Sequence, residues 1–211
     1  MKKFLKYVLD NYLQNRGDER IKELPLIFNE NQGYIHYRKG SVIMYALRDY
    51  IGEETLNAAL RKYLKAVAYQ EPPYTNALEF LSYLRQATPD SLRYILTDMF
   101  ENITLYENQV TQARYTLTPD GKYKVELAIK AKKLRADSLG VESEISINDW
   151  IDIGALGKDG KELYLKKHKI AQPEMMFELL VDELPVEAGV DPYVKLIDRN
   201  PDDNIKKVEK S

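Results

Sequence analysis

The chain has 211 residues, of which 44% are apolar and 30% are charged, and its formal net charge is −2 at pH 7. This near balance argues against nucleic acid as the main partner, because binding to phosphates requires a clear basic excess. The sequence contains no cysteine, which excludes disulfides, thiolate nucleophiles and cysteine-based zinc sites.

The N-terminal stretch "MKKFLKYVLDNYL" has the lysines of a signal peptide, but Asp10 and Asn11 interrupt its apolar run. We therefore interpret it as an amphipathic helix that ends near Gly17. No stretch approaches the ~18 apolar residues of a membrane span, so we expect a soluble piece.

Two further helices are predicted next in the chain. Ser41–Ile51 is apolar on nearly all sides and stops at Gly52, which places it in the core of a helical layer. Glu53 opens the following helix, where the helix dipole favours anions. The spacing predicts that Leu56 and Leu64 lie on its buried face.

The last two predicted helices are recognised by their capping residues. Asn76, with Glu79 three residues later, resembles a capping box. Thr88 and Pro89 supply an N-cap and a first-turn proline for a final helix that reaches Met99.

From about residue 105 the spacing of the apolar residues changes from that of a helix to every second residue. "KYKVELAIKAK" alternates charged residues with apolar ones, as a strand with one wet face does, and the turn "PDG" joins it to "VTQARYTLT" as a hairpin. Further strand-like segments bring the number to six or seven, which suggests a β-sandwich. We expect the lysine-rich end after Asn204 to fray.

The sequence therefore predicts an α+β fold of two domains. Residues 1–104 form a helical layer, and residues 105–211 form an antiparallel Ig-like β-sandwich with an irregular C-terminal tail. The boundary falls near residues 102–108, where "ENITLYEN" loses both periods.

Classical catalytic motifs are not found. There is no glycine-rich phosphate loop, no G-x-S-x-G and no H-E-x-x-H. His36 and His168 fall in different predicted domains and cannot form the local pair that grips zinc on one helix face, so we expect surface or hydrogen-bonded imidazoles.

The stretch "YIHYRKG", Tyr34–Gly40, precedes the buried helix. A tyrosine here can hold its phenol at the rim of a cavity and donate a hydrogen bond to a developing oxyanion. Arg38 and Lys39 would adjust the local potential, and Gly40 would permit a tight turn. The alternative is a tyrosine that only anchors the start of the helix.

The longer segment "YIHYRKGSVIMYALRDYIGEETLNAALRKYL" resembles gluzincin aminopeptidases, the family of aminopeptidase N. In that family Tyr-x-Lys-Gly opens a core helix, and a glycine, an acidic pair and a second helix ending in Tyr-Leu follow. "YRKG" from Tyr37 fills the motif. "YLQNRGDERIKELPL", "DIGALGKDGKELYLKKHKI" and "AGVDPYVKLIDRNPDDN" resemble the bacterial subgroup whose peptidase-like region is joined to an ABC-transporter permease.

The resemblance implies that an intact parent removes N-terminal residues from peptides. Tyr37 would stabilise the oxyanion formed when zinc-activated water attacks the peptide carbonyl, and Tyr34 would be a neighbour in the same wall. The family's zinc ligands precede the tyrosine and have no counterpart here. We therefore expect a C-terminal fragment that carries no zinc and is inactive alone, from a parent attached to the bacterial inner membrane. Its expected partners are the upstream peptidase domain, the permease segments and, in the parent, a peptide substrate.

A different class of function is also compatible with the sequence. The β-sandwich would then be a non-catalytic interaction or regulatory module associated with a membrane transporter. Intact zinc ligands upstream would favour the enzyme, and degenerate ones would favour the interaction module.

An acidic segment near the C-terminus has the spacing of a calcium loop. Positions 1, 3, 5, 7 and 12 of an EF-hand would be Asp198, Asn200, Asp202, Asn204 and Glu209. Pro201 lies inside this segment, and Asp203 replaces the glycine that makes the sharp turn. The alternative is an Asx-rich tail capped by its own backbone.

Overall fold

The computed structural model describes residues 1–211 and has an α+β fold with helices and two β-sheets. The chain divides into two compact units. The helical unit comprises Lys3–Thr104 and Arg135–Glu142, and the strand unit comprises Met1–Lys2, Leu105–Leu134 and Ser143–Ser211. No helix is long and apolar enough to cross a membrane.

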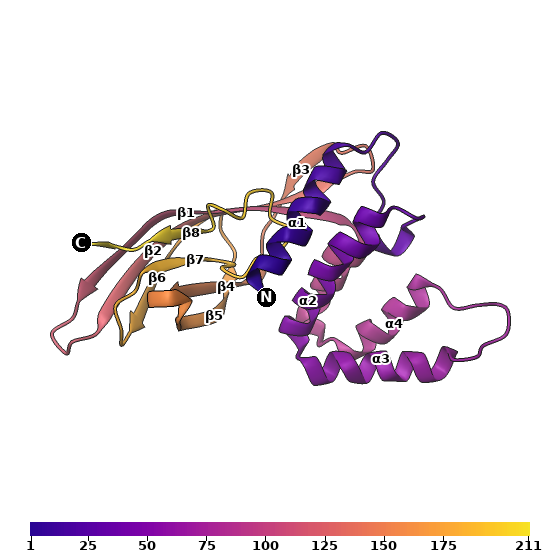
Figure 1. Cartoon of the computed structure of the whole chain (residues 1–211), viewed down its shortest axis with the longest axis horizontal. Coiled ribbons are helices and arrows are strands. Elements are labelled where there is room, and N and C mark those ends of the chain that lie inside the picture. The colour runs from indigo at the N-terminus through magenta and orange to yellow at the C-terminus, as the bar shows by residue number, and fades with distance from the viewer. The chain divides into compact units, whose positions relative to one another are not determined.

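The helical elements are numbered as in Figure 1. They are α1 (Lys2–Gly17), η1 (Leu26–Phe28), η2 (Tyr34–Lys39), α2 (Gly40–Ile51), α3 (Glu53–Val67), α4 (Ala77–Ala87), η3 (Asp90–Leu92), α5 (Arg93–Leu96), η4 (Thr97–Glu101) and η5 (Lys158–Gly160).

The first three predicted helices are confirmed as α1, α2 and α3. Gly52 separates α2 from α3 with φ at +86°, a backbone conformation that glycine adopts without steric cost. Leu56 is buried as predicted, but Leu64 is 60% exposed, so the prediction for Leu64 was wrong. The helix packs against α2 and α4, and its second half leaves the Leu64 side chain uncovered.

The two predicted caps have different outcomes. The side chain of Asn76 accepts a hydrogen bond from the backbone N–H of Glu79 at 3.0 Å, which confirms it as the N-cap of α4. Thr88 is not the N-cap of a final helix. It is the C-cap of α4, and its hydroxyl donates to the carbonyl of Leu84 at 2.8 Å. The residues that follow form η3, the short helix α5 and η4.

The strand unit contains most of two sheets (Figure 1). One sheet has the order β3-β2-β1-β9, with β6 also paired to β2, and the other has the order β5-β4-β7-β8. The pairs β2–β6, β4–β5, β4–β7 and β7–β8 are antiparallel, whereas β1–β9 is parallel. The strands are β1 (Ile103–Leu117), β2 (Tyr123–Ala136), β3 (Glu142–Ile145), β4 (Asp149–Leu156), β5 (Glu162–Ile170), β6 (Glu174–Val181), β7 (Glu187–Val190), β8 (Ile205–Lys207) and β9 (Glu209–Lys210).

The strand pattern is confirmed in β2, where Val125, Leu127 and Ile129 are buried between more exposed neighbours. The segment "ENITLYEN", where the boundary was expected, contains the start of β1 at Ile103, with four consecutive buried residues. One local expectation was wrong. The lysine-rich end does not fray, since β8 pairs with β7 and β9 pairs with β1.

Candidate functional site

The stretch Tyr34–Lys39 forms a π-helical turn that runs directly into α2. The backbone N–H of Gly40 reaches the carbonyl of Ile35, five residues earlier, which is the spacing of a π-helix. Gly40 itself has helical angles, φ −57° and ψ −37°, so the expected tight turn is wrong. Single π-turns inside helices occur frequently at functional sites.

A buried ionic cluster lies beneath this turn. The Lys39 ammonium lies 3.3 Å from Oε1 of Glu23, and Nε of Arg16 donates to Oε2 of the same carboxylate at 2.6 Å. The hydroxyl of Tyr12 donates to Oε1 of Glu23. Burial first, and then Glu23, raise the pKa of Tyr12 well above its usual value.

Lys39 is only 1% exposed, and its ammonium faces the Glu23 carboxylate rather than the solvent. Burial lowers the pKa of Lys39, and the Glu23 carboxylate opposes that effect by favouring the ammonium form. The cluster thus ties the end of the π-turn to α1 and to the segment that carries Glu23.

The two tyrosines of the turn have different surroundings. The Tyr34 hydroxyl donates to Oε2 of Glu19 at 3.0 Å, and the Tyr34 ring stacks on Tyr12 at 6.0 Å. Burial, followed by the hydrogen bond to Glu19, raises the pKa of Tyr34. Tyr37 is 70% exposed, and its ring lies 4.3 Å from that of His36. The Tyr37 hydroxyl makes no hydrogen bond within the chain, so it is free to donate one to a ligand.

Tyr37 lines a groove of about 570 Å³, here called the Tyr37 groove. Arg38 is the one charged side chain that lines it, and its guanidinium lies 5.5 Å from the centre of the Tyr7 ring. The groove is formed by residues of α1 and of the π-turn region: Phe4, Val8, Asn11, Asn15, Gly33, Tyr34, Tyr37, Arg38 and Ser41.

Both histidines are hydrogen-bonded imidazoles, as expected. Nδ1 of His36 shares a hydrogen bond with Nδ2 of Asn29 at 2.8 Å. Nε2 of His168 lies 2.7 Å from the Tyr164 hydroxyl, and burial lowers the pKa of His168.

The acidic C-terminal segment does not form an EF-hand. Asp198 is completely buried and uses its carboxylate as a cap for neighbouring backbone: Oδ1 accepts from the N–H of Asn200 at 2.9 Å. Glu209, the expected twelfth ligand, lies in β9 opposite Arg114. The self-capped Asx segment, the alternative from sequence, describes what forms.

The sequence reasoning missed Glu23 and Arg16. A usable signal was present, because Lys39 lies four residues after Ile35 and four before Ile43, both fully buried. A lysine on such a face requires an acidic partner.

No protein-family model matches the chain, and no curated protein matches it significantly.

Proposed function

We propose that the helical unit is the C-terminal part of a gluzincin aminopeptidase-like catalytic domain, in which Tyr37 donates a hydrogen bond to the oxyanion of the tetrahedral intermediate. The observation that carries this proposal is the contrast within one turn. The Tyr34 hydroxyl is occupied by Glu19, whereas the Tyr37 hydroxyl is free and stands on the wall of a groove.

This arrangement suits transition-state stabilisation. A donor held in position before the reaction needs no reorganisation when negative charge develops on the oxygen. The buried Lys39–Glu23 pair at the end of the turn supports Tyr37 by fixing the backbone that carries it.

The residues of this chain do not fit a catalytic zinc site. No group of three or more histidine, cysteine, aspartate or glutamate side chains is arranged to hold a metal ion. In the proposed parent, an upstream peptidase region would provide the zinc ligands and the general base, and the substrate would be a peptide. The metal would supply the Lewis acid, while Tyr37 would only donate its hydrogen bond.

The proposal assigns residues 1–104 to the peptidase-like domain and residues 105–211 to an Ig-like β-sandwich. Buried residues in both sheets, such as Leu127 of β2 and Ile153 of β4, are compatible with two sheets that share one core. Attachment to an ABC-transporter permease at the bacterial inner membrane belongs to the same proposal.

The test is Tyr37→Phe in the intact parent, assayed with aminoacyl-4-nitroanilides. We expect kcat to fall about 10²–10³-fold with little change in KM, as for loss of a contact made only in the transition state. Tyr34→Phe is the matched control and should lower kcat less than about tenfold. Equal effects of the two substitutions would contradict the role of Tyr37. Degenerate zinc ligands upstream would favour a non-catalytic interaction module.

A further inference from the structure

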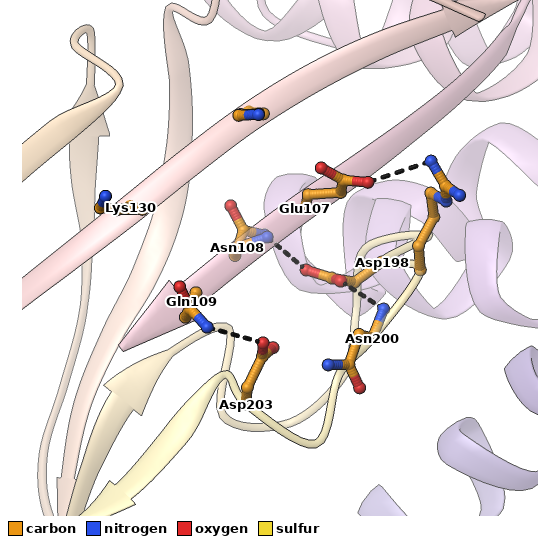
Figure 2. A pocket seen from close by; sticks show the side chains of 9 residues that line it. Glu107, Asn108, Gln109, Lys130, Asp198, Asn200 and Asp203 are labelled. Carbon is orange, nitrogen blue, oxygen red and sulfur yellow. Dashed lines mark hydrogen bonds and ion pairs between the residues drawn. The ribbon is translucent and has the colours of Figure 1, made fainter. Parts of the chain in front are cut away.

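A second cavity, of about 510 Å³, lies in the strand unit, on the side of β1 that faces the segment 198–204 (Figure 2). Its lining comes from β1 residues 107–109, from Lys130 and Lys132 of β2, and from residues 198–200 and 203. The proposed aminopeptidase-like function makes no use of it.

Asp198 is a buried carboxylate without a cationic partner. It is 0% exposed, and its oxygens accept only from neutral groups: the N–H groups of Asn108 and Asn200 and the side-chain amide of Asn204. Of the other five buried carboxylates, Asp191 likewise caps backbone N–H groups. The remaining four each pair with a lysine or arginine: Glu23 with Lys39 and Arg16, Asp98 with Arg135, Asp149 with Lys133, and Asp152 with Lys167 and Lys195.

Two further oxygens at this cavity lack a hydrogen-bond partner. Asn108 is 2% exposed, and both its side-chain oxygen Oδ1 and its amide nitrogen Nδ2 are buried without a hydrogen-bond partner. Oδ1 of Asp203 is also buried and unpartnered, while Oδ2 accepts from Gln109 at 3.1 Å. A buried acceptor left without a partner destabilises the folded chain.

No ion pair joins Asp198 to the cations that line the cavity. Arg199 pairs with Glu107 at 3.0 Å, and Lys130 pairs with Glu174 at 3.1 Å. Lys132 is exposed. Among the residues that line the cavity, its ammonium is the cation that would compete with a metal ion for the carboxylates.

We propose that this cavity binds a calcium ion through side-chain oxygens of Asn108, Asp198 and Asp203, with water completing the coordination. Each carboxylate oxygen has two acceptor positions, and Oδ1 of Asp198 uses one of them for Asn200. Carboxylate and amide oxygens are the ligands that calcium prefers, and it tolerates irregular geometry with several ligands. Because only two carboxylates take part, the affinity should lie at about 10⁻⁴–10⁻³ M, the weak end of calcium sites.

The experiment is calorimetric titration of the 211-residue chain with calcium chloride, together with thermal unfolding in calcium, magnesium and ionic-strength-matched sodium chloride. We expect saturable heat with calcium and a rise in Tm of about 3–6 °C at tenfold excess over Kd, with a smaller effect of magnesium. Asp203→Asn should weaken binding about tenfold or more, because it removes one of two ligand charges. Asp202→Asn, the neighbouring exposed aspartate, is the matched control and should bind like the original chain.

Lys132→Gln tests whether calcium or the Lys132 ammonium is the cation that neutralises the carboxylates. If calcium occupies the site, this variant should bind it more tightly than the original chain, because a competing charge is removed. Binding by the Lys132→Gln variant alone would assign the counterion role to Lys132 and overturn the proposal. Three results with the folded original chain would also overturn the proposal. They are no calorimetric heat with calcium, an equal response to calcium and magnesium, and a calcium affinity equal to that of the Asp203→Asn variant.

Discussion

The Lys39 ammonium lies 3.3 Å from the Glu23 carboxylate, and both side chains are at least 97% buried. Arg16 and Tyr12 complete the surroundings of this carboxylate. A buried ion pair is costly to assemble but far more costly to break on one side, because the remaining charge has lost both water and its partner.

Lys39→Met should therefore lower the free energy of unfolding by about 3 kcal/mol, since methionine keeps most of the apolar stem and leaves Glu23 with one cation fewer. Urea denaturation measures this change. Lys3→Met, at an exposed position of α1, is the control and should stay within about 0.5 kcal/mol of the original chain. Combining Lys39→Met with Glu23→Gln should cost less than the sum of the two single changes. An unchanged free energy of unfolding in Lys39→Met would show that the Lys39–Glu23 pair does not hold the π-turn.

The 211-residue chain alone should not hydrolyse aminoacyl-4-nitroanilides, even with added zinc. The reason is that Tyr37 can stabilise an oxyanion but cannot activate the attacking water. A spectrophotometric assay with and without zinc chloride checks this, using the same preparation for the metal-free control. Zinc-dependent turnover that survives further purification would contradict the proposed division of roles.

Asp191 predicts a pH dependence of stability. Its side chain is buried and caps the backbone N–H groups of Lys195 and Leu196, and burial raises its pKa to about 7. The folded state therefore holds this proton more tightly than the unfolded state, whose pKa is near 3.8. The contribution of Asp191 to the free energy of unfolding is thus largest below about pH 4 and is lost as the pH rises to about 7.

Denaturation of the original chain and of Asp191→Asn at several pH values isolates this contribution. The difference between the two curves should change between pH 4 and pH 7 and become flat above pH 7. The pKa of Asp198 is also raised, but its effect on stability is common to both proteins and cancels in the difference. A difference that is flat throughout this range would rule out the titration of Asp191.

Gly189 should not tolerate a side chain. A Cβ atom at this position would lie 2.2 Å from the carbonyl oxygen of Asn204 and 2.9 Å from Cγ1 of Ile205. Gly189→Ala should push β8 away from β7 and destabilise the chain by about 1–3 kcal/mol. Gly17→Ala, where nothing lies within 4 Å of the new Cβ, is the matched control. Thermal unfolding followed by circular dichroism compares the two, and similar Tm values would count against the clash.

The sequence predicted the elements whose evidence is local. The helices α1 to α3, the Asn76 cap and the alternation in β2 follow from periodicity and capping chemistry within a few residues. Thr88 was misassigned because a threonine can equally return its hydroxyl to the preceding turn, and only the path of the chain decides between the two.

The surroundings of the candidate site could be predicted only in part. Tyr37 is exposed, but no local pattern identified Glu23 as the partner of Lys39, because Glu23 lies in a segment between helices whose apolar residues have no regular spacing. The register of β8 and β9 could not be predicted either, because two- and three-residue strands gain their stability from long-range pairing rather than from their own residues.

The C-terminal segment has a consequence for the way the strand unit comes apart. Within seven residues it forms a ladder with β7 of one sheet and then with β1 of the other, and the N–H of Ser211 donates to the carbonyl of Tyr115 at 2.9 Å. Peeling this segment from its end would release β1 first and β7 immediately afterwards. Residues 205–210 thus join the two sheets, so that a force applied at residue 211 acts first on the β9–β1 pairing and then on the β8–β7 pairing.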